Sequence, residues 1–127
     1  MARISAILTT YNQAGYVREA VRDLLAQECE DLEIVLSDDC STDGSYAVLL
    51  DEAERYRGPH RLTVNRTPQN QGLNAHLNGL IAGTKGDFII PFAGDDRFRP
   101  DRARKLSERL GKDGSWLVYS DADFIGP

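Results

Sequence analysis

Short apolar segments of strand length alternate along this chain with segments whose apolar residues recur at helical spacing. The alternation runs through nearly the whole sequence, and a strand-like segment both begins and ends it. Consecutive strands separated by a helix pair in parallel, because the helix returns the chain to the same end of the sheet. We therefore predict an α/β fold of three layers, in which a mostly parallel sheet lies between helices on both faces.

The limits of these elements follow from the apolar pattern and from glycine and proline. The strands are predicted at residues 4–9, 32–37, 61–65, 88–93 and 115–120, and the helices at about 14–28, 41–57, 71–84 and 100–111. Gly58 and Pro59 end the second helix, and Pro100 suits the first turn of the last helix. The third helix carries its large apolar residues on one side, namely Leu73, Leu77, Leu80 and Ile81.

Composition restricts the class of protein further. A chain of 127 residues suffices for one domain with its own core, which we place at residues 1–127. No apolar run approaches the roughly 20 residues that span a bilayer, and the N-terminus lacks a secretory signal pattern. Cys29 and Cys40 have neither the spacing of a zinc site nor that of a disulfide framework. We expect a cytoplasmic protein.

The charge balance bears on possible partners. Twenty acidic and 15 basic residues give a net charge of -5. An acidic surface disfavours nucleic acid as a partner, because the phosphate backbone attracts basic residues. A single nucleotide is not disfavoured, since a metal ion can neutralise its phosphates locally.

Two adjacent carboxylates, Asp95 and Asp96, follow the apolar segment at 88–93. Gly94 allows a turn there, and ligands of open α/β sheets bind at the carboxyl ends of the strands. Neighbouring carboxylates repel each other unless a positive group lies beside them. A divalent cation completed by substrate phosphates is a natural partner, and a pair of solvated turn residues is the alternative.

Polar residues also follow the first two strands. The segments Thr9–Gln13, Ser37–Gly44 and Gly94–Asp96 leave the same edge of a parallel sheet, so we expect them to surround one crevice. At least one of Asp38 and Asp39 is available there to accept a ring N–H or a ribose hydroxyl.

Several of these residues have a simpler structural explanation. Tyr11 offers a face for stacking a base, or it is an ordinary half-buried aromatic. Asn12 and Gln13 could cap the first helix, and the segment Ser41–Asp43 could cap the second.

The sequence lacks a glycine-rich phosphate cradle. Neither GxGxxG after the first strand nor GxxxxGK[ST] occurs, which disfavours dinucleotide dehydrogenases and P-loop enzymes. A nucleotidyltransferase would need a basic glycine-rich loop where Thr9–Gln13 stands. A bound diphosphate would therefore need another counter-charge, and a cation at Asp95 and Asp96 would supply it.

Four segments together resemble the N-terminal half of the family 2 glycosyltransferases, bacterial enzymes with the Rossmann-like GT-A fold that build polysaccharides and cell-surface glycans. The segments are Thr10–Asn12, Asp38–Asp43, Asn70–Gly79 and Ala93–Asp96. Each is weakly specific alone, but their order and spacing together are specific. The resemblance covers nearly the whole chain and implies an inverting transfer from a UDP- or dTDP-sugar to a glycan or other cell-surface acceptor.

The resemblance also implies roles for individual residues. Tyr11 would stack on the base, Asp39 would accept its ring N–H, and Thr9 would line the same pocket through its backbone. Asp96, together with Asp95, would hold Mn²⁺ or Mg²⁺ between the two phosphates and the protein. The remaining donor-site residues carried over are Asn12, Asn70, Gly72 and His76.

The chain departs from the family pattern in two places. Ala93 stands where the family often has Asp, so only Asp95 and Asp96 of the metal-binding motif are present. His76 stands where the family often has an Arg that contacts the nucleotide. A surface or helix-face histidine is the alternative for that position.

The general base of the family lies well beyond the acidic pair. Asp121 and Asp123 come too early for that role, and the sequence ends 31 residues after Asp96. We therefore expect a truncated chain that supplies the donor-binding half, without the acceptor-binding part. The full-length parent could associate with the inner face of a membrane. The alternative function is a non-catalytic module that binds nucleotide sugars.

Overall fold

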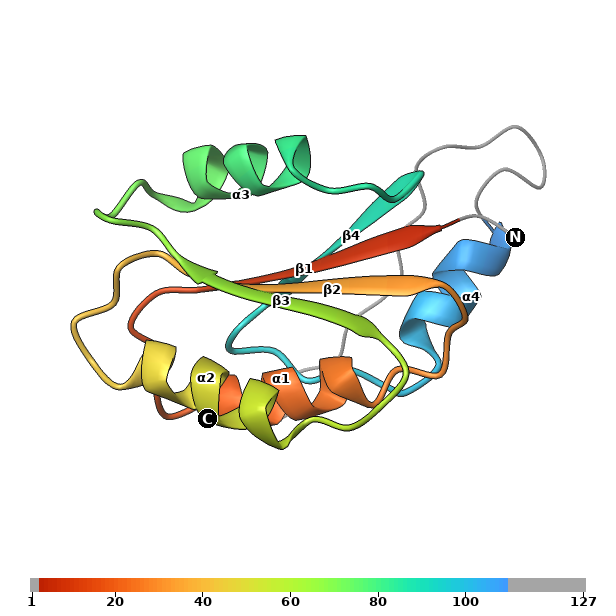
Figure 1. The fold of residues 1–127 in the computed structure, drawn as a ribbon, viewed down its shortest axis with the longest axis horizontal. Helices are drawn as coiled ribbons and strands as arrows, with labels where there is room; N and C mark the ends of the chain where they lie inside the picture. Colours follow the sequence, from red (N-terminus) through yellow and green to blue (C-terminus); the bar gives the residue numbers. More distant parts are fainter. Residues whose placement is uncertain (1–2, 110–127) are drawn as a thin grey trace.

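The computed structural model describes residues 3–109, which form a parallel sheet with helices on both faces (Figure 1). Within that range the sheet order is β3-β2-β1-β4, and every neighbouring pair of strands is parallel. The α/β prediction is therefore confirmed. The strands are β1 (Ile4–Thr10), β2 (Leu32–Asp38), β3 (Arg61–Arg66) and β4 (Phe88–Ala93), and the helices are α1 (Val17–Leu25), α2 (Ser45–Arg55), α3 (Leu73–Ala82) and α4 (Arg102–Arg109).

The observed strands match the predicted ones closely, whereas the helices are shorter. Each described strand lies within one residue of its predicted limits, but α1 and α2 begin several residues later than expected. The residues before both helices are held in a loop by contacts between neighbouring segments, which are described below. The strand predicted at 115–120, together with Asp121 and Asp123, lies outside the described residues.

One face of the sheet carries the apolar core. Alternate residues of β1, β2 and β4 pack there against α1, and α4 adds Ala103 and Leu106 to the same cluster. The stripe of α1 on this face is fully buried and consists of Val17, Ala20, Val21 and Leu24. Burying such a side chain stabilises the fold by about 1.5–3 kcal/mol for a residue the size of Leu. This face therefore accounts for most of the apolar burial.

The opposite face is covered by α3, which lies apart from the other helices in Figure 1. Because strand residues alternate between faces, Ser5, Ile7 and Ser37 point to this side, and all three are buried. The buried residue of α3 is His76, while Leu73 is 65% exposed and Ile81 is 37% exposed. The apolar side of this helix is therefore exposed at both ends, and the residue of α3 that is buried against the sheet is polar.

The apolar segment at 88–93 forms β4, which is only partly buried. In the described part of the chain β4 is the outer strand beside β1, and Pro91 is exposed on it. Proline is tolerated at a sheet edge because it lacks the N–H that an inner strand would need.

Within residues 3–109, none of the helices is long and apolar enough to cross a membrane.

Candidate functional site

The loops after the four strands meet at the carboxyl edge of the sheet. Backbone hydrogen bonds join them, since Asp39 N donates to Thr10 O at 2.9 Å and Gly94 N donates to Thr9 O at 3.1 Å. Thr67 N, just after β3, donates to Asp38 O at 2.9 Å. The structure therefore brings together the three predicted loops and adds the loop after β3, which carries Asn70 and Gly72, the residues that only the family resemblance had implied.

The loops after β1 and β2 are tied together by side chains. The backbone N–H groups of residues 12–14 donate in turn to Ser41 Oγ, Ser45 Oγ and Asp43 Oδ2, at 2.8, 2.9 and 3.1 Å. Dinucleotide-binding folds offer backbone N–H groups after the first strand to a pyrophosphate. Here the N–H groups of residues 12–14 already donate hydrogen bonds to side-chain oxygens of the protein, so they are not free for a pyrophosphate. A diphosphate would therefore bind elsewhere along the edge.

Asn12 belongs to the same junction. Its backbone is in the left-handed region, with φ of 51°, and its Oδ1 accepts hydrogen bonds from Thr42 N at 2.8 Å and Thr42 Oγ1 at 3.3 Å. The N-cap of α1 is Tyr16 and has no side-chain cap. Asn12 therefore holds the loop after β2 and does not cap the first helix.

The carboxylate of Asp39 lies at the centre of the loop after β3. Only 3% of the residue is exposed. Its Oδ1 accepts from Thr67 Oγ1 and Gln71 N, both at 2.9 Å, and its Oδ2 accepts from Gly72 N at 2.9 Å and Asn70 Nδ2 at 3.2 Å. We call these four donor residues, Thr67, Asn70, Gln71 and Gly72, the Asp39 collar.

The collar determines the charge of Asp39. Burial by itself raises the pKa of this carboxyl, but the hydrogen bonds from Gln71, Thr67 and Gly72 lower the pKa below its usual value. Asp39 is therefore ionised at neutral pH. A carboxylate offers about four lone-pair positions, so a ring N–H could bind only by replacing a present donor. The amide of Asn70 makes the longest of the four contacts.

Asp38, the residue before Asp39, has a structural role. The residue is fully buried and accepts from the backbone N–H and the hydroxyl of Ser41. Arg66 Nε lies 3.5 Å from Asp38 Oδ2, and Arg66 Nη2 donates to Ser41 O at 2.9 Å. Sequence reasoning missed Arg66, although Arg66 and Asp38 are register partners in parallel strands and are therefore neighbours.

The residues expected to contact a base, Tyr11 and Thr9, differ in their exposure to solvent. Tyr11 is exposed, with 46% of its residue surface accessible to solvent. Thr9 is half-buried, and its carbonyl already accepts from Gly94 N. Tyr11 is thus available for stacking, while the contribution of Thr9 is to hold the acidic loop in place.

Asp95 and Asp96 are both exposed directly after β4. Gly94 is buried against the loop after β1, where an added Cβ would lie 2.5 Å from Gln13 Oε1 and 2.8 Å from Thr10 Oγ1. The close approach of the two loops therefore requires glycine and sets the position of the acidic pair.

Arg102 of α4 is a positive group close to the acidic pair. Burial lowers the pKa of Arg102, while the charge of Asp96 acts in the opposite direction. The guanidinium carbon lies 5.5 Å from the ring centre of Phe92 and 5.8 Å from that of Phe98. The sequence offered no signal for this residue, because its proximity to Asp96 depends on how α4 packs.

Two neighbouring carboxylates are suitable ligands for a hard divalent cation such as Mg²⁺ or Mn²⁺. Among residues 3–109 there is no group of three or more His, Cys, Asp or Glu side chains that could hold a metal. The pair therefore fits a cation whose remaining positions are filled by phosphate oxygens and water, and not an all-protein metal cage.

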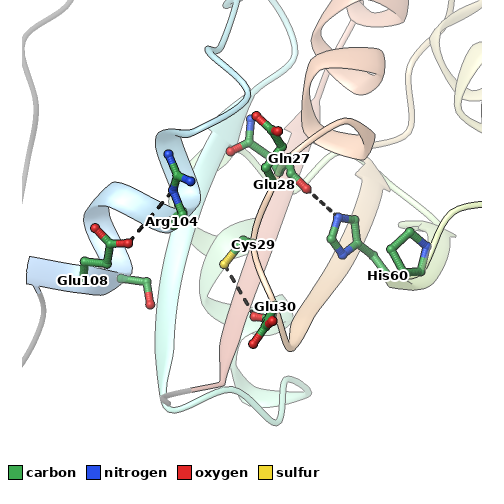
Figure 2. A pocket seen from close by; sticks show the side chains of 9 residues that line it. Gln27, Glu28, Cys29, Glu30, His60, Arg104 and Glu108 are labelled. Carbon is green, nitrogen blue, oxygen red and sulfur yellow. Dashed lines mark hydrogen bonds and ion pairs between the residues drawn. The ribbon is translucent and has the colours of Figure 1, made fainter.

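A hollow of about 610 Å³ lies away from these loops (Figure 2). Its lining includes Cys29, His60 and Arg104, which come from the segments before β2 and β3 and from α4. Those segments are at the amino edge of the parallel sheet, opposite to the acidic pair. Burial raises the pKa of the Cys29 thiol, which disfavours a reactive thiolate there. The hollow is therefore not part of the candidate site.

The sequence-predicted site residues fall into two groups. Thr9 lies near the carboxyl end of β1, and the loops of the same edge contain Tyr11, Asn12, Asp39, Asn70, Gly72, Asp95 and Asp96. His76 does not, because it is buried beneath α3 and its Nε2 lies 2.7 Å from Ser37 Oγ. It is neither a surface histidine nor placed in the open part of the edge.

The family model described as Glycosyl transferase family 2 matches residues 5–126. The chain belongs to this family. The succinoglycan biosynthesis protein ExoO of Rhizobium meliloti (strain 1021) is 28% identical over 122 residues, which are 96% of this chain and 34% of that protein. The chain thus spans about a third of the length of this curated relative.

Solved structures show the same family 2 fold. S. aureus TarS 1–349 in complex with UDP-GlcNAc is similar with a TM-score of 0.70 and 28% identity, covering 84% of this chain and 30% of that one. The mannosyltransferase PcManGT of Pyrobaculum calidifontis, in complex with GDP-Man and Mn²⁺, has a TM-score of 0.70 and 25% identity over 76% of this chain and 28% of its own. The predicted membership of family 2 and the predicted GT-A fold are confirmed.

Proposed function

We propose that this chain binds a UDP- or dTDP-sugar at the carboxyl edge of its sheet and supplies the donor-binding half of an inverting glycosyltransferase. The observation that carries the proposal is the exposed pair Asp95 and Asp96, fixed by Gly94 against the loop that bears the exposed ring of Tyr11. The TarS complex with UDP-GlcNAc supports a UDP-sugar, and the PcManGT complex with GDP-Man supports a nucleotide-sugar donor in general.

The base would lie between Tyr11 and the Asp39 collar. Stacking on an exposed aromatic ring is worth about 1–3 kcal/mol per base. Asp39 is ionised and could accept the ring N–H in place of the Asn70 amide, whose contact is the longest in the collar. Asn12 would act by holding this loop to the loop after β2.

The diphosphate would lie toward Asp95 and Asp96, which would hold Mn²⁺ or Mg²⁺. A bound cation of this kind supplies Lewis-acid stabilisation of the leaving diphosphate. Of the protein's own residues, Gly94 sets the position of the two carboxylates, and Arg102 is the cationic residue whose pKa the charge of Asp96 affects. Within residues 3–109 we assign no general base.

The acceptor in this proposal is a glycan or another cell-surface molecule, as for a protein of polysaccharide biosynthesis. We place the reaction in the cytoplasm, with the acceptor at the inner face of the membrane. Both cysteines are free, which agrees with a reducing compartment.

Calorimetry with UDP, with and without Mn²⁺, tests the donor site. We expect binding that requires Mn²⁺ and weakens at least tenfold in Asp96→Ala, because the variant removes a metal ligand. Glu54→Ala is the control, since Glu54 is an exposed carboxylate on α2. Metal-independent binding, or full affinity in Asp96→Ala, would contradict the proposed metal role.

A further inference from the structure

His76 is the buried residue of α3, with 2% of its surface exposed, and it pairs with a hydroxyl of the sheet. Its Nε2 lies 2.7 Å from Ser37 Oγ on β2, and Ser37 Oγ donates to Asn65 Oδ1 on the neighbouring strand β3. A polar chain of three side chains therefore links α3, β2 and β3 just below the carboxyl edge. It lies on the sheet face opposite to the apolar core.

The directions of these hydrogen bonds indicate which nitrogen of the His76 ring carries the proton. A hydroxyl has one hydrogen, and with that of Ser37 directed to Asn65 we assign His76 Nε2 as the donor to Ser37. Burial lowers the pKa of His76, although the charges of Asp39 and Asp38 act against that shift. The ring is therefore neutral at neutral pH, with its proton on Nε2.

The two ends of this contact border the Asp39 collar. Ser37 lies two residues before Asp39 on the same strand end. His76 N donates to Gly72 O at 3.0 Å, which closes the first turn of α3 directly after the collar. Gly72 has a φ of 83°, so the chain turns sharply between the collar and the helix. A shift of α3 at His76 would therefore move the N–H groups that bind Asp39.

We propose that His76 is a positioning residue of the donor site, which fixes the first turn of α3 on Ser37 and so keeps the collar closed around Asp39. It acts through Asp39 and need not touch the nucleotide. The consequence for donor binding rests on the proposed function, whereas the effect on the collar does not.

The collar can be examined without any ligand. We compare the unaltered chain with His76→Gln, whose amide retains a donor near Nε2, and with His76→Leu, which removes the donor. In His76→Leu we expect at least tenfold faster exchange of the Gln71 and Gly72 amide hydrogens, measured by NMR, because these two N–H groups hold Asp39. His76→Gln should resemble the unaltered chain.

A second variant guards against loss of folding in His76→Leu. Ser37→Ala removes the acceptor and leaves the ring in place, so it should open the collar in the same way. Unchanged exchange of the Gln71 and Gly72 amide hydrogens in a folded His76→Leu or Ser37→Ala would overturn the inference. A general loss of packing would instead raise exchange rates throughout the sheet, and that result would also overturn it.

Titration with UDP and Mn²⁺ then measures the consequence for donor binding. We expect affinity to fall at least tenfold in His76→Leu and to stay within about threefold in His76→Gln. If the unaltered chain does not bind UDP, the proposed function fails, and the collar measurements still decide the role of His76. Full affinity together with an opened collar would overturn the link between His76 and the donor site.

Discussion

The backbone at Gly94 passes so close to the loop after β1 that a methyl group has no space there. An alanine Cβ would lie 2.8 Å from Thr10 Oγ1 and 2.9 Å from Thr10 Cβ, and Thr10 belongs to a central strand that cannot move freely. Relieving such a clash typically costs about 1–3 kcal/mol. The strand is packed on its other side, so the acidic loop is the part that gives way.

We therefore predict that Gly94→Ala displaces Asp95 and Asp96 and weakens Mn²⁺-dependent UDP binding at least tenfold, as measured by calorimetry. Gly79→Ala is the matched control, because a Cβ at Gly79 meets no atom within 4 Å. Alanine in that helix position should stabilise the fold by about 0.5–1 kcal/mol and leave binding unchanged. Equal affinities of the two variants would contradict the role given to Gly94.

For individual residues, the sequence indicated where the polar side chains gather but not what each one contacts. Asp38 and Asp39 are adjacent and chemically identical, yet one binds Ser41 and the other the collar. The difference depends on the backbone, since Cys40 after them adopts a φ of 60° that a sequence pattern does not specify. Arg66 and Arg102 were missed for a related reason, because their partners are set by register and helix packing.

The helices α1 and α3 show how far an apolar pattern can be interpreted. Both carry leucines at helical spacing, yet Leu24 of α1 is fully buried and Leu73 of α3 is 65% exposed. The pattern predicted α1 correctly because an apolar sheet face lies beneath it. At α3 the residue that packs on Ser37 is a histidine, and helical spacing alone does not tell which face of a helix meets the sheet.

The same substitution should therefore have unequal effects in the two helices. Leu24→Ala should lower the free energy of unfolding by about 2–5 kcal/mol, since it leaves a cavity in the core. Leu73→Ala should change it by no more than about 0.5 kcal/mol, as for other surface substitutions. Urea denaturation of both variants at pH 7 measures the difference. A comparable loss in Leu73→Ala would mean that α3 is covered by more than the described residues show.

In residues 3–109 one sheet face carries the apolar core, and the other buries an ionisable residue, His76, which leads to a specific dependence of stability on pH. The folded state lowers the pKa of buried His76, so it resists protonation more than the unfolded chain does. As the pH falls below about 6.5, the unfolded state gains a proton first, and stability decreases until the lowered pKa is passed.

The carboxylates with a lowered pKa act in a separate range. Asp39, Asp43 and Glu33 stabilise the folded state fully above their unfolded values near pH 4, and that contribution is lost as the pH falls through their folded pKa values. Urea midpoints measured from pH 8 to pH 3 should therefore decrease in two steps. His76→Gln should abolish the upper step and keep the lower one, because glutamine does not titrate. An upper step that persists in this variant would show that another group is responsible for it.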